Sequence, residues 1–254
     1  MQKTFIKNRD NKKISVLIDE VKNSRGLAFV MHGFGGFKEQ KHIELMAQSF
    51  YNSDYTTIRF DTTHTIGESE GNMEEANLTN YYEDLEDVIK WSKGQTWYQE
   101  PFCLAAHSLG GICIILYALK YFKEIKALAP ISTVVSGKIT LDDFKSEDTA
   151  EWEKTGWAIQ ESHSKLGVVK KMRWLQFKQD ILQYDVLPQV GQLKIPILLI
   201  TGENDQCLDS QKLLFDHLAT QKELHIIKGA KHTIREEKQL KEFKDIFDKW
   251  IEKL

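Results

Sequence analysis

An α/β fold, in which helices cover both faces of a mostly parallel central sheet, is the fold class that this sequence predicts. Continuous apolar runs at residues 26–31 and 102–106 are typical of strands that are buried on both faces. Segments with apolar residues at helical spacing, such as residues 80–93, lie between runs of this kind. Strands that alternate with helices form parallel sheets, and 254 residues suffice for one large domain or for a domain with an insert.

The elements follow one another along the chain in this alternating order. Two short strands, joined by the turn at residues 8–12, precede the first buried strand. The predicted strands are residues 4–7, 14–18, 26–31, 55–60, 102–106, 125–129, 195–201 and 223–227. The predicted helices are residues 40–51, 80–93, 109–122, 210–219 and 237–253. In such sheets ligands bind beyond the carboxyl ends of the strands, so the loops that follow the strands are the places to search for a site.

The composition is that of a globular protein and excludes several classes of partner. The chain is 41% hydrophobic and carries a net charge of −3, with its Lys and Arg residues interleaved among Asp and Glu, so we expect neither nucleic acid nor an anionic membrane surface as a partner. No apolar stretch has the length of a membrane span or of a signal peptide. Cys103, Cys113 and Cys207 lack metal-site spacing, and we expect a cytoplasmic protein with reduced cysteines and no membrane insertion.

Residues 131–187 interrupt the alternation of strands and helices. This segment has helical pieces but no convincing buried strand, and it contains Trp152, Trp157 and Trp174. Because aromatic residues argue against disorder, we interpret it as an ordered cap over the strand ends, inserted into a core formed by residues 1–130 and 188–254. The three tryptophans are candidates for substrate binding. The alternative is that they form a small core of the insert itself.

Ser108 stands where the apolar run at residues 102–106 gives way to a helical pattern. A serine in so tight a strand-to-helix turn has crowded neighbours, so the residues two before and two after it must be small. Here they are Ala106 and Gly110, and alanine replaces the first glycine of the G-x-S-x-G pattern. The turn would expose the hydroxyl as a nucleophile, although a buried turn serine is also compatible with the motif alone.

Two further residues supply what a nucleophilic serine needs, namely a base and an acid that orients it. Asp205 follows the predicted strand at residues 195–201, and His232 follows the last predicted strand. Both are expected at the same sheet edge as Ser108. The chain order Ser, Asp, His is the one associated with this topology.

Several other acids and histidines compete for these roles. Asp209 lies where the next helix is expected to be capped. His107 adjoins Ser108 but is expected to point away from it, and His225 lies inside a predicted strand. Asp142 and Asp143 are the fallback candidates for the acid.

The oxyanion of an acyl-transfer reaction needs two amide donors. One is expected from Leu109, the residue after the nucleophile, and the other from Phe34 in the glycine-rich loop at residues 32–36. His32 in that loop is expected to be structural. A phosphate-binding loop is a poor alternative because neither Gly-Lys-Ser/Thr nor G-x-G-x-x-G is present.

The motifs together resemble the serine-esterase type of α/β-hydrolase over essentially the whole chain. They are His-Gly-Phe-Gly-Gly at 32–36, Asp61 with Gly-Glu-Ser-Glu-Gly at 67–71, Ala-His-Ser-Leu-Gly-Gly at 106–111, Gly-Glu-Asn-Asp at 202–205 and Gly-Ala-Lys-His at 229–232. Bacterial cinnamoyl/feruloyl esterases and monoacylglycerol-lipase-like hydrolases are the most similar subfamilies. The resemblance implies Ser108, Asp205 and His232 as triad. The loop after residue 60 departs from the family pattern, since it lacks the Arg-Gly-His core.

We therefore expect a serine carboxylesterase that acts on small to medium acyl or hydroxycinnamoyl-like esters, with no metal or organic cofactor. Its partner would be a small-molecule ester, and a homodimer is possible. An acyltransferase, thioesterase, C–C hydrolase or small peptidase would use the same triad. A non-catalytic binding protein on this scaffold is the remote alternative.

Overall fold

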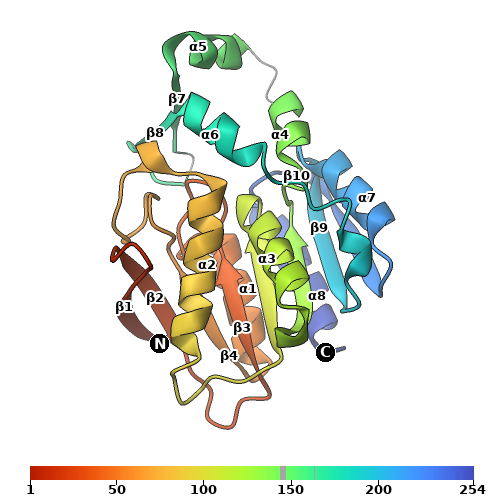
Figure 1. The fold of residues 1–254 in the computed structure, drawn as a ribbon. Coiled ribbons are helices and arrows are strands. Elements are labelled where there is room, and N and C mark those ends of the chain that lie inside the picture. The colour runs from red at the N-terminus through yellow and green to blue at the C-terminus, as the bar shows by residue number, and fades with distance from the viewer. Residues whose placement is uncertain (144–146, 163) are drawn as a thin grey trace.

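The computed structural model describes residues 1–143, 147–162 and 164–254. Its centre is an eight-stranded sheet in the order β1-β2-β4-β3-β5-β6-β9-β10 (Figure 1). The strands are β1 (Gln2–Lys7), β2 (Lys13–Asp19), β3 (Gly26–Met31), β4 (Tyr55–Phe60), β5 (Phe102–His107), β6 (Ile125–Ile131), β9 (Ile197–Asn204) and β10 (Lys222–Lys231). β1 pairs antiparallel with β2, and β2 with β4, whereas the remaining pairs are parallel. The predicted α/β class is thus confirmed.

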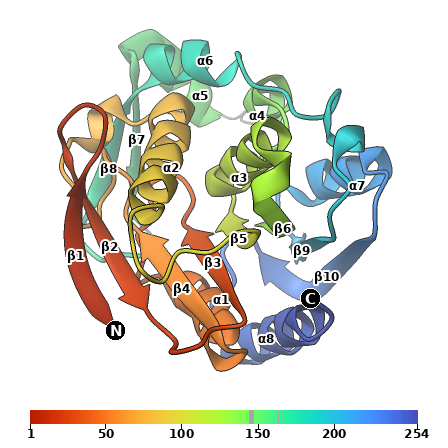
Figure 2. The same ribbon diagram turned by 60° about the horizontal axis from the view of Figure 1, so that its bottom comes forward.

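Helices cover both faces of this sheet (Figure 2). They are α1 (Lys41–Asn52), α2 (Leu78–Ser92), α3 (Leu109–Lys120), α7 (Leu208–His217) and α8 (Glu237–Ile251), with short 3₁₀ turns η1 (Met73–Glu75), η2 (Phe122–Glu124) and η3 (Val190–Gln192). Apolar side chains of α2, α3 and α7 pack in one core cluster, and those of α1 and α8 pack in a second. The sheet therefore separates two hydrophobic cores, as its doubly buried strands predicted.

Strand β5 illustrates how the sequence builds both cores. Successive side chains of a strand point to opposite faces, so Leu104 and Ala106 join the core under α2 and α3, whereas Cys103 and Ala105 join the core under α1 and α8. Every residue of β5 is buried. Apolar residues therefore fill the first five positions of the strand, which is why this run shows no alternation of apolar and polar residues; the strand ends with the buried polar side chain of His107.

The observed bounds differ from the predicted ones in six of the eight strands of the sheet, and two of the differences have a clear cause. β6 continues to Ile131, two residues beyond the prediction, because His107 of β5 pairs with Ile131 in parallel register. β9 begins at Ile197, later than the predicted residue 195. Pro196 has no amide hydrogen to donate to the neighbouring strand, although its carbonyl accepts the amide of Leu128 at 3.0 Å.

The segment between β6 and β9 contains further elements that lie outside the large sheet. They are α4 (Gly137–Asp143), α5 (Glu147–Thr155), α6 (Trp174–Ile181) and the antiparallel hairpin of β7 (Trp157–Glu161) and β8 (Val169–Arg173). Figure 1 shows them above the upper end of the sheet, opposite the two chain termini. The hairpin was not predicted, because its strands are mostly exposed and carry no continuous apolar run.

Candidate active site

Ser108 forms the turn between β5 and α3. Its backbone angles are φ +54° and ψ −120°, in a region that residues with a side chain rarely adopt. Its amide donates a hydrogen bond of 2.9 Å to the carbonyl of Ile131 at the end of β6. The chain thus passes from strand to helix within one residue, and Ser108 comes to line a cavity at the carboxyl ends of the strands.

The small residues around Ser108 are required by close packing. A Cβ atom on Gly110 would lie 2.4 Å from the carbonyl oxygen of His32, and one on Gly33 would lie 2.8 Å from Cβ of Ser108. The side chain of Ala106 is tolerated because it faces Gly110, which has no side chain; a Cβ atom there would lie at a tight 3.2 Å from Cβ of Ala106. The departure at Ala106 from the G-x-S-x-G pattern is therefore compatible with the turn.

A chain of hydrogen bonds joins three side chains that lie far apart in the sequence. Nε2 of His232 is 2.9 Å from Oγ of Ser108, and Nδ1 of His232 is 2.8 Å from Oδ1 of Asp205. Ser108 follows β5, Asp205 follows β9 and His232 follows β10. The parallel strands bring all three loops to one edge of the sheet.

Asp205 is held as a carboxylate by its own hydrogen bonds. Its Oδ2 accepts the hydroxyl of Thr201 at 3.0 Å, and its Oδ1 accepts the amide of Cys207 at 2.8 Å. Burial alone would raise the pKa of Asp205, but the hydrogen bond with His232 and the charge of that ring hold it well below its usual range. A charged acid in this place orients the imidazole and stabilises its protonated form.

A second imidazole lies behind His232. Nε2 of His107 donates to the main-chain carbonyl of His232 at 2.8 Å, and the two rings are 4.8 Å apart. The ring of His42 from α1 packs 4.5 Å from His107 on its other side. Burial, followed by repulsion from His232, lowers the pKa of His107 to about 3, so this ring is neutral at physiological pH. The sequence indicated only that His107 would point away from Ser108, not that it would contact the backbone of His232.

Phe34 and Leu109 place two backbone amides beside Ser108. The loop of Phe34 adjoins Ser108, because the position that a Cβ of Gly33 would occupy lies in contact with Cβ of that serine. Leu109 is the first residue of α3, whose first amides have no partner within the helix. Within the described ranges, the amides of Phe34 and Leu109 donate no hydrogen bond, and both residues line the cavity with Ser108. They are available to an oxyanion.

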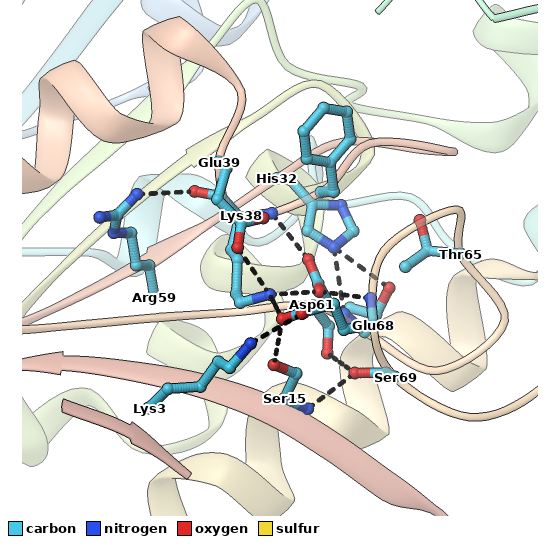
Figure 3. A network of polar contacts seen from close by, with 12 residues as sticks. Lys3, Ser15, His32, Lys38, Glu39, Arg59, Asp61, Thr65, Glu68 and Ser69 are labelled. Atoms are coloured by element: carbon cyan, nitrogen blue, oxygen red, sulfur yellow. Dashed lines mark hydrogen bonds and ion pairs between the residues drawn. The ribbon is translucent and has the colours of Figure 1, made fainter. Parts of the chain in front are cut away.

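A buried ion pair fixes the loop that carries Phe34. Lys38 and Asp61 are both fully buried, and their charged atoms lie 2.7 Å apart. Figure 3 shows the lysine also reaching Glu68, at 2.7 Å. The ring of His32 bridges its own loop and the loop after β4: Nδ1 contacts the carbonyl of Gly33 at 2.7 Å, and Nε2 accepts the amide of the residue after Asp61. The loop that departs from the family pattern therefore anchors the loop that carries Phe34.

Two hollows meet at Ser108. One is a largely apolar cavity of about 120 Å³, and the other is a larger cleft of about 1010 Å³ with a more polar lining. Trp152 and Trp174 line the cavity, with Phe34, Met172 and Phe177. Trp157 does not line it; the ammonium of Lys171 lies 3.8 Å from the centre of its ring. Of the three tryptophans that the sequence singled out, two are thus placed at the site.

The prediction that Asp209 caps the next helix is wrong. α7 begins at Leu208 and is preceded by Cys207, which makes no side-chain cap. Asp209 lies in the first turn, is 94% exposed and forms an ion pair of 3.2 Å with Lys212. A carboxylate in the first turn still complements the helix dipole, which accounts for the acidic residue at this place in the sequence.

The remaining candidates lie at the margin of the site or outside it. Asp143 lines the cavity, but His232 bonds to Asp205 and not to Asp143. His225 in β10 contacts Glu223, two residues before it, at 3.2 Å. Neither residue takes part in the chain of hydrogen bonds that ends at the serine.

Within the part of the chain that the structure describes, one group of three side chains has the donor atoms to bind a metal ion. Donor atoms of Asp205, Cys207 and His232 lie within 4.8 Å of one another. The nitrogen of His232 that faces Asp205 is already engaged with it, and burial raises the pKa of Cys207, which disfavours the thiolate that a metal would require. The arrangement therefore fits proton transfer better than metal binding.

The fold and this site define the class of protein as a serine hydrolase with the α/β-hydrolase fold. More precisely, the chain belongs to the family described as Serine aminopeptidase, S33 (Hydrolase_4), whose model matches residues 22–184. This match covers more than half of the chain. It confirms the resemblance to α/β-hydrolases that the motifs indicated.

Curated relatives and solved structures agree with this assignment. The chain is 24% identical over 211 residues to the mitochondrial palmitoyl-protein thioesterase ABHD10 of Bos taurus, and 24% identical over 205 residues to that of Homo sapiens. These matches cover 78% and 79% of this chain but only 63% and 64% of the relatives, so the chain spans less than two thirds of their length.

Among solved structures, Est1E from Butyrivibrio proteoclasticus with bound ferulic acid has a TM-score of 0.81 at 20% identity, covering 98% of both chains. Mouse ABHD10 has a TM-score of 0.80 at 19% identity, covering 100% of this chain and 99% of that one. Identities this low establish the shared fold. A bilayer-spanning helix would have to be longer and more apolar than any helix in the described residues.

Proposed function

We propose that this chain hydrolyses carboxylic esters through an acyl-enzyme on Ser108. His232 takes the proton of the serine hydroxyl as Oγ attacks the ester carbonyl, and it returns that proton to the departing alcohol. Asp205 orients the ring and stabilises its charged form. Water then attacks the acyl-enzyme with help from the same base. The observation that carries this proposal is the hydrogen-bonded chain from Asp205 through His232 to Ser108, with distances of 2.8 and 2.9 Å.

The amides of Phe34 and Leu109 are proposed as the oxyanion hole. Both lack acceptors within the described residues and line the cavity beside Ser108. Donors that are fixed before the reaction stabilise charge without reorganising, and losing one such donor typically costs about 3 kcal/mol. The buried Lys38–Asp61 pair supports this role, since it holds the loop of Phe34 in place.

Residues 131–187 are proposed as a cap, and the apolar cavity as the acyl site beneath it. Trp152, Trp174 and Phe177 from this segment form much of the cavity wall. A narrow apolar cavity accommodates a small to medium acyl chain or an aromatic ring such as a hydroxycinnamoyl group. The ferulic acid bound to Est1E, whose fold this chain shares, is consistent with an aromatic acyl group.

A thioester is a second candidate substrate, favoured by the curated relatives named as thioesterases. The same atoms would attack it. Peptide hydrolysis at a free amino terminus, which the family's description names, is disfavoured because such a substrate carries a positive charge. The amino group would have to lie near Ser108, where Lys170 already lines both hollows. Acyl transfer and C–C hydrolysis would differ only in the acceptor or in the bond that breaks.

The test is turnover of short-chain p-nitrophenyl esters by the wild type and by Ser108→Ala. We expect the variant to lose activity by about a thousandfold or more. A competing alcohol in the same assay would reveal acyl transfer as a new ester product. Turnover by Ser108→Ala at the wild-type rate would overturn the proposal.

A further inference from the structure

The two hollows at Ser108 differ in which catalytic group they expose. Leu109, one of the proposed oxyanion residues, lines only the apolar cavity, whereas His232 lines only the larger cleft; Ser108 and Phe34 line both. In the proposed function, on which this inference rests, His232 must protonate the departing group, so that group leaves through the cleft. The acyl part then occupies the cavity, and the cleft receives the alcohol or thiol.

Lys170 stands at the junction of these two hollows and lines both. It projects from β8 against the loop of Phe34, because a Cβ atom on Gly35 would lie 2.7 Å from its Cδ and 3.6 Å from its ammonium nitrogen. Its neighbour Lys171 pairs with Glu74 at 3.4 Å. In the described parts of the chain, the ammonium group of Lys170 has no ion pair and no hydrogen bond. A half-buried cation without a counter-ion among these residues therefore lines both hollows that contain Ser108.

Two further cations, Lys231 and Arg235, line the cleft, and both residues are exposed. Arg235 also makes no ion pair with any described residue. Burial, followed by the charge of Arg235, lowers the pKa of Lys170. Two like charges near each other destabilise the empty site, and an anion between them removes that cost. Two acids, Glu161 and Glu236, also line the cleft, but both residues are exposed and bind none of these cations. Lys170 is thus the half-buried cation of the cleft and the one that also lines the apolar cavity, whereas Lys231 and Arg235 line the cleft alone.

We propose that Lys170, with Arg235, binds an anionic group on the departing part of the substrate, so that the preferred substrates are esters or thioesters of a carboxylate- or phosphate-bearing alcohol or thiol. The anion would lie in the cleft while the apolar acyl group lies in the cavity. A charge-assisted hydrogen bond to such a group strengthens as water is excluded from the site. The preferred substrate would then carry an apolar group on the acyl side of the scissile bond and an anionic group on the alcohol or thiol side.

The test compares two esters that share one acyl group. The anionic probe is 3-butanoyloxy-4-nitrobenzoate, and the neutral probe is 2-nitrophenyl butanoate. The ratio of kcat/KM for the anionic over the neutral ester is expected to fall by about tenfold in Lys170→Met, chiefly through KM, and by less in Arg235→Gln. Lys170→Arg should restore most of the ratio. Lys171→Met removes the same charge from the opposite side of the hairpin and is the matched control, with an unchanged ratio.

An unchanged ratio in Lys170→Met, with thermal unfolding like that of the wild type, would overturn this inference while leaving the ester hydrolase intact. Failure of Ser108→Ala to abolish turnover would instead overturn the proposed function. A second pair, butanoyl-coenzyme A and the butanoyl thioester of N-acetylcysteamine, distinguishes a phosphate from a carboxylate. For each pair, the ratio of kcat/KM for the anionic over the neutral substrate is compared between the wild type and Lys170→Met. The pair whose ratio falls further identifies the preferred anion.

A binding measurement covers the case in which neither ester is hydrolysed. The product 3-hydroxy-4-nitrobenzoate should protect Ser108 from a fluorophosphonate at a concentration about tenfold lower than 2-nitrophenol requires, and Lys170→Met should remove that difference. Equal protection by the two phenols would contradict the anion site.

Discussion

Nε2 of His107 donates a hydrogen bond of 2.8 Å to the main-chain carbonyl of His232. The residue that precedes the proposed nucleophile thus holds the backbone of the proposed base. Because burial keeps His107 neutral, one ring nitrogen carries the proton that this hydrogen bond needs. The strand end of β5 therefore positions two members of the site, Ser108 through the turn and His232 through His107.

Replacing His107 with alanine should lower kcat by about tenfold, because His232 loses the contact that fixes its backbone. Ester turnover measured with and without the substitution checks this. His225→Ala serves as the control, because that imidazole lies in β10 and contacts Glu223 instead of a residue of the proposed triad. Equal rates for His107→Ala and the wild type would show that the loop is held by other contacts.

The protein should lose stability as the pH falls below about 6.5. Burial lowers the pKa values of His32, His42 and His107, so their contribution is complete above the ordinary histidine pKa and is lost as the unfolded chain takes up protons. At pH 5, each histidine that stays neutral in the folded protein lowers the free energy of unfolding by about 2 kcal/mol relative to its value at pH 7.5. Urea unfolding at pH 7.5 and 5.0 measures the loss.

Two variants sharpen this measurement. His42→Gln should reduce the loss between pH 7.5 and 5.0, whereas His217→Gln, at an exposed position on α7, should leave it unchanged. Identical unfolding free energies at both pH values for the wild type would contradict the neutral, buried state of these rings.

Removing the lysine from the ion pair of Lys38 and Asp61 should destabilise the protein by about 3–5 kcal/mol, because the fully buried carboxylate of Asp61 loses its cation. Lys38→Met tests this by thermal or urea unfolding; Asp61→Asn is the milder change, because Lys38 keeps its ion pairs with Glu39 and Glu68. Replacing both residues, as Lys38→Met with Asp61→Leu, should cost less than the single substitution. Lys3→Met is the control, because its ion pair with Glu68 is exposed. A single variant as stable as Lys3→Met would show that the buried pair contributes little.

Gly110→Ala should lower ester turnover by about a hundredfold, because the added methyl group would lie 2.4 Å from the carbonyl of His32 and must displace the loop of Phe34. In the turn after α2, Gly94→Ala meets only Trp91, at an ordinary 3.6 Å, and should change nothing. Steady-state kinetics of the two alanine variants give the comparison. Similar activities for both would mean that the loop shifts without harm.

The elements that carry the site could be predicted from the sequence because their signals are local. Continuous apolar runs mark β3, β5 and β9, and the residues after such strands share one sheet edge in any parallel sheet. The proximity of Ser108, Asp205 and His232 was predictable for that reason. The bounds of β3 and β4 were predicted without error, since every residue of both strands is buried.

What could not be predicted depends on contacts between segments far apart in the chain. Lys170 lies in a half-exposed hairpin whose sequence has no distinctive period, and its place beside Gly35 follows only from tertiary packing. The prediction for Asp209 was wrong because helix α7 begins one residue before it. A capping role depends on the exact residue at which a helix begins, and sequence patterns do not define that residue. Asp61 could be placed at a strand end, but its partner Lys38 could not be identified without the fold.

The most direct test of the proposed nucleophile is to locate the residue that a fluorophosphonate modifies in the folded protein. Intact mass followed by peptide mapping should show one adduct, on Ser108, that is absent from Ser108→Ala and from heat-denatured protein. The hydrogen bond of Ser108 to His232 is the reason to expect this selectivity. An adduct on another residue, or an unmodified Ser108 in protein that still hydrolyses esters, would contradict the account.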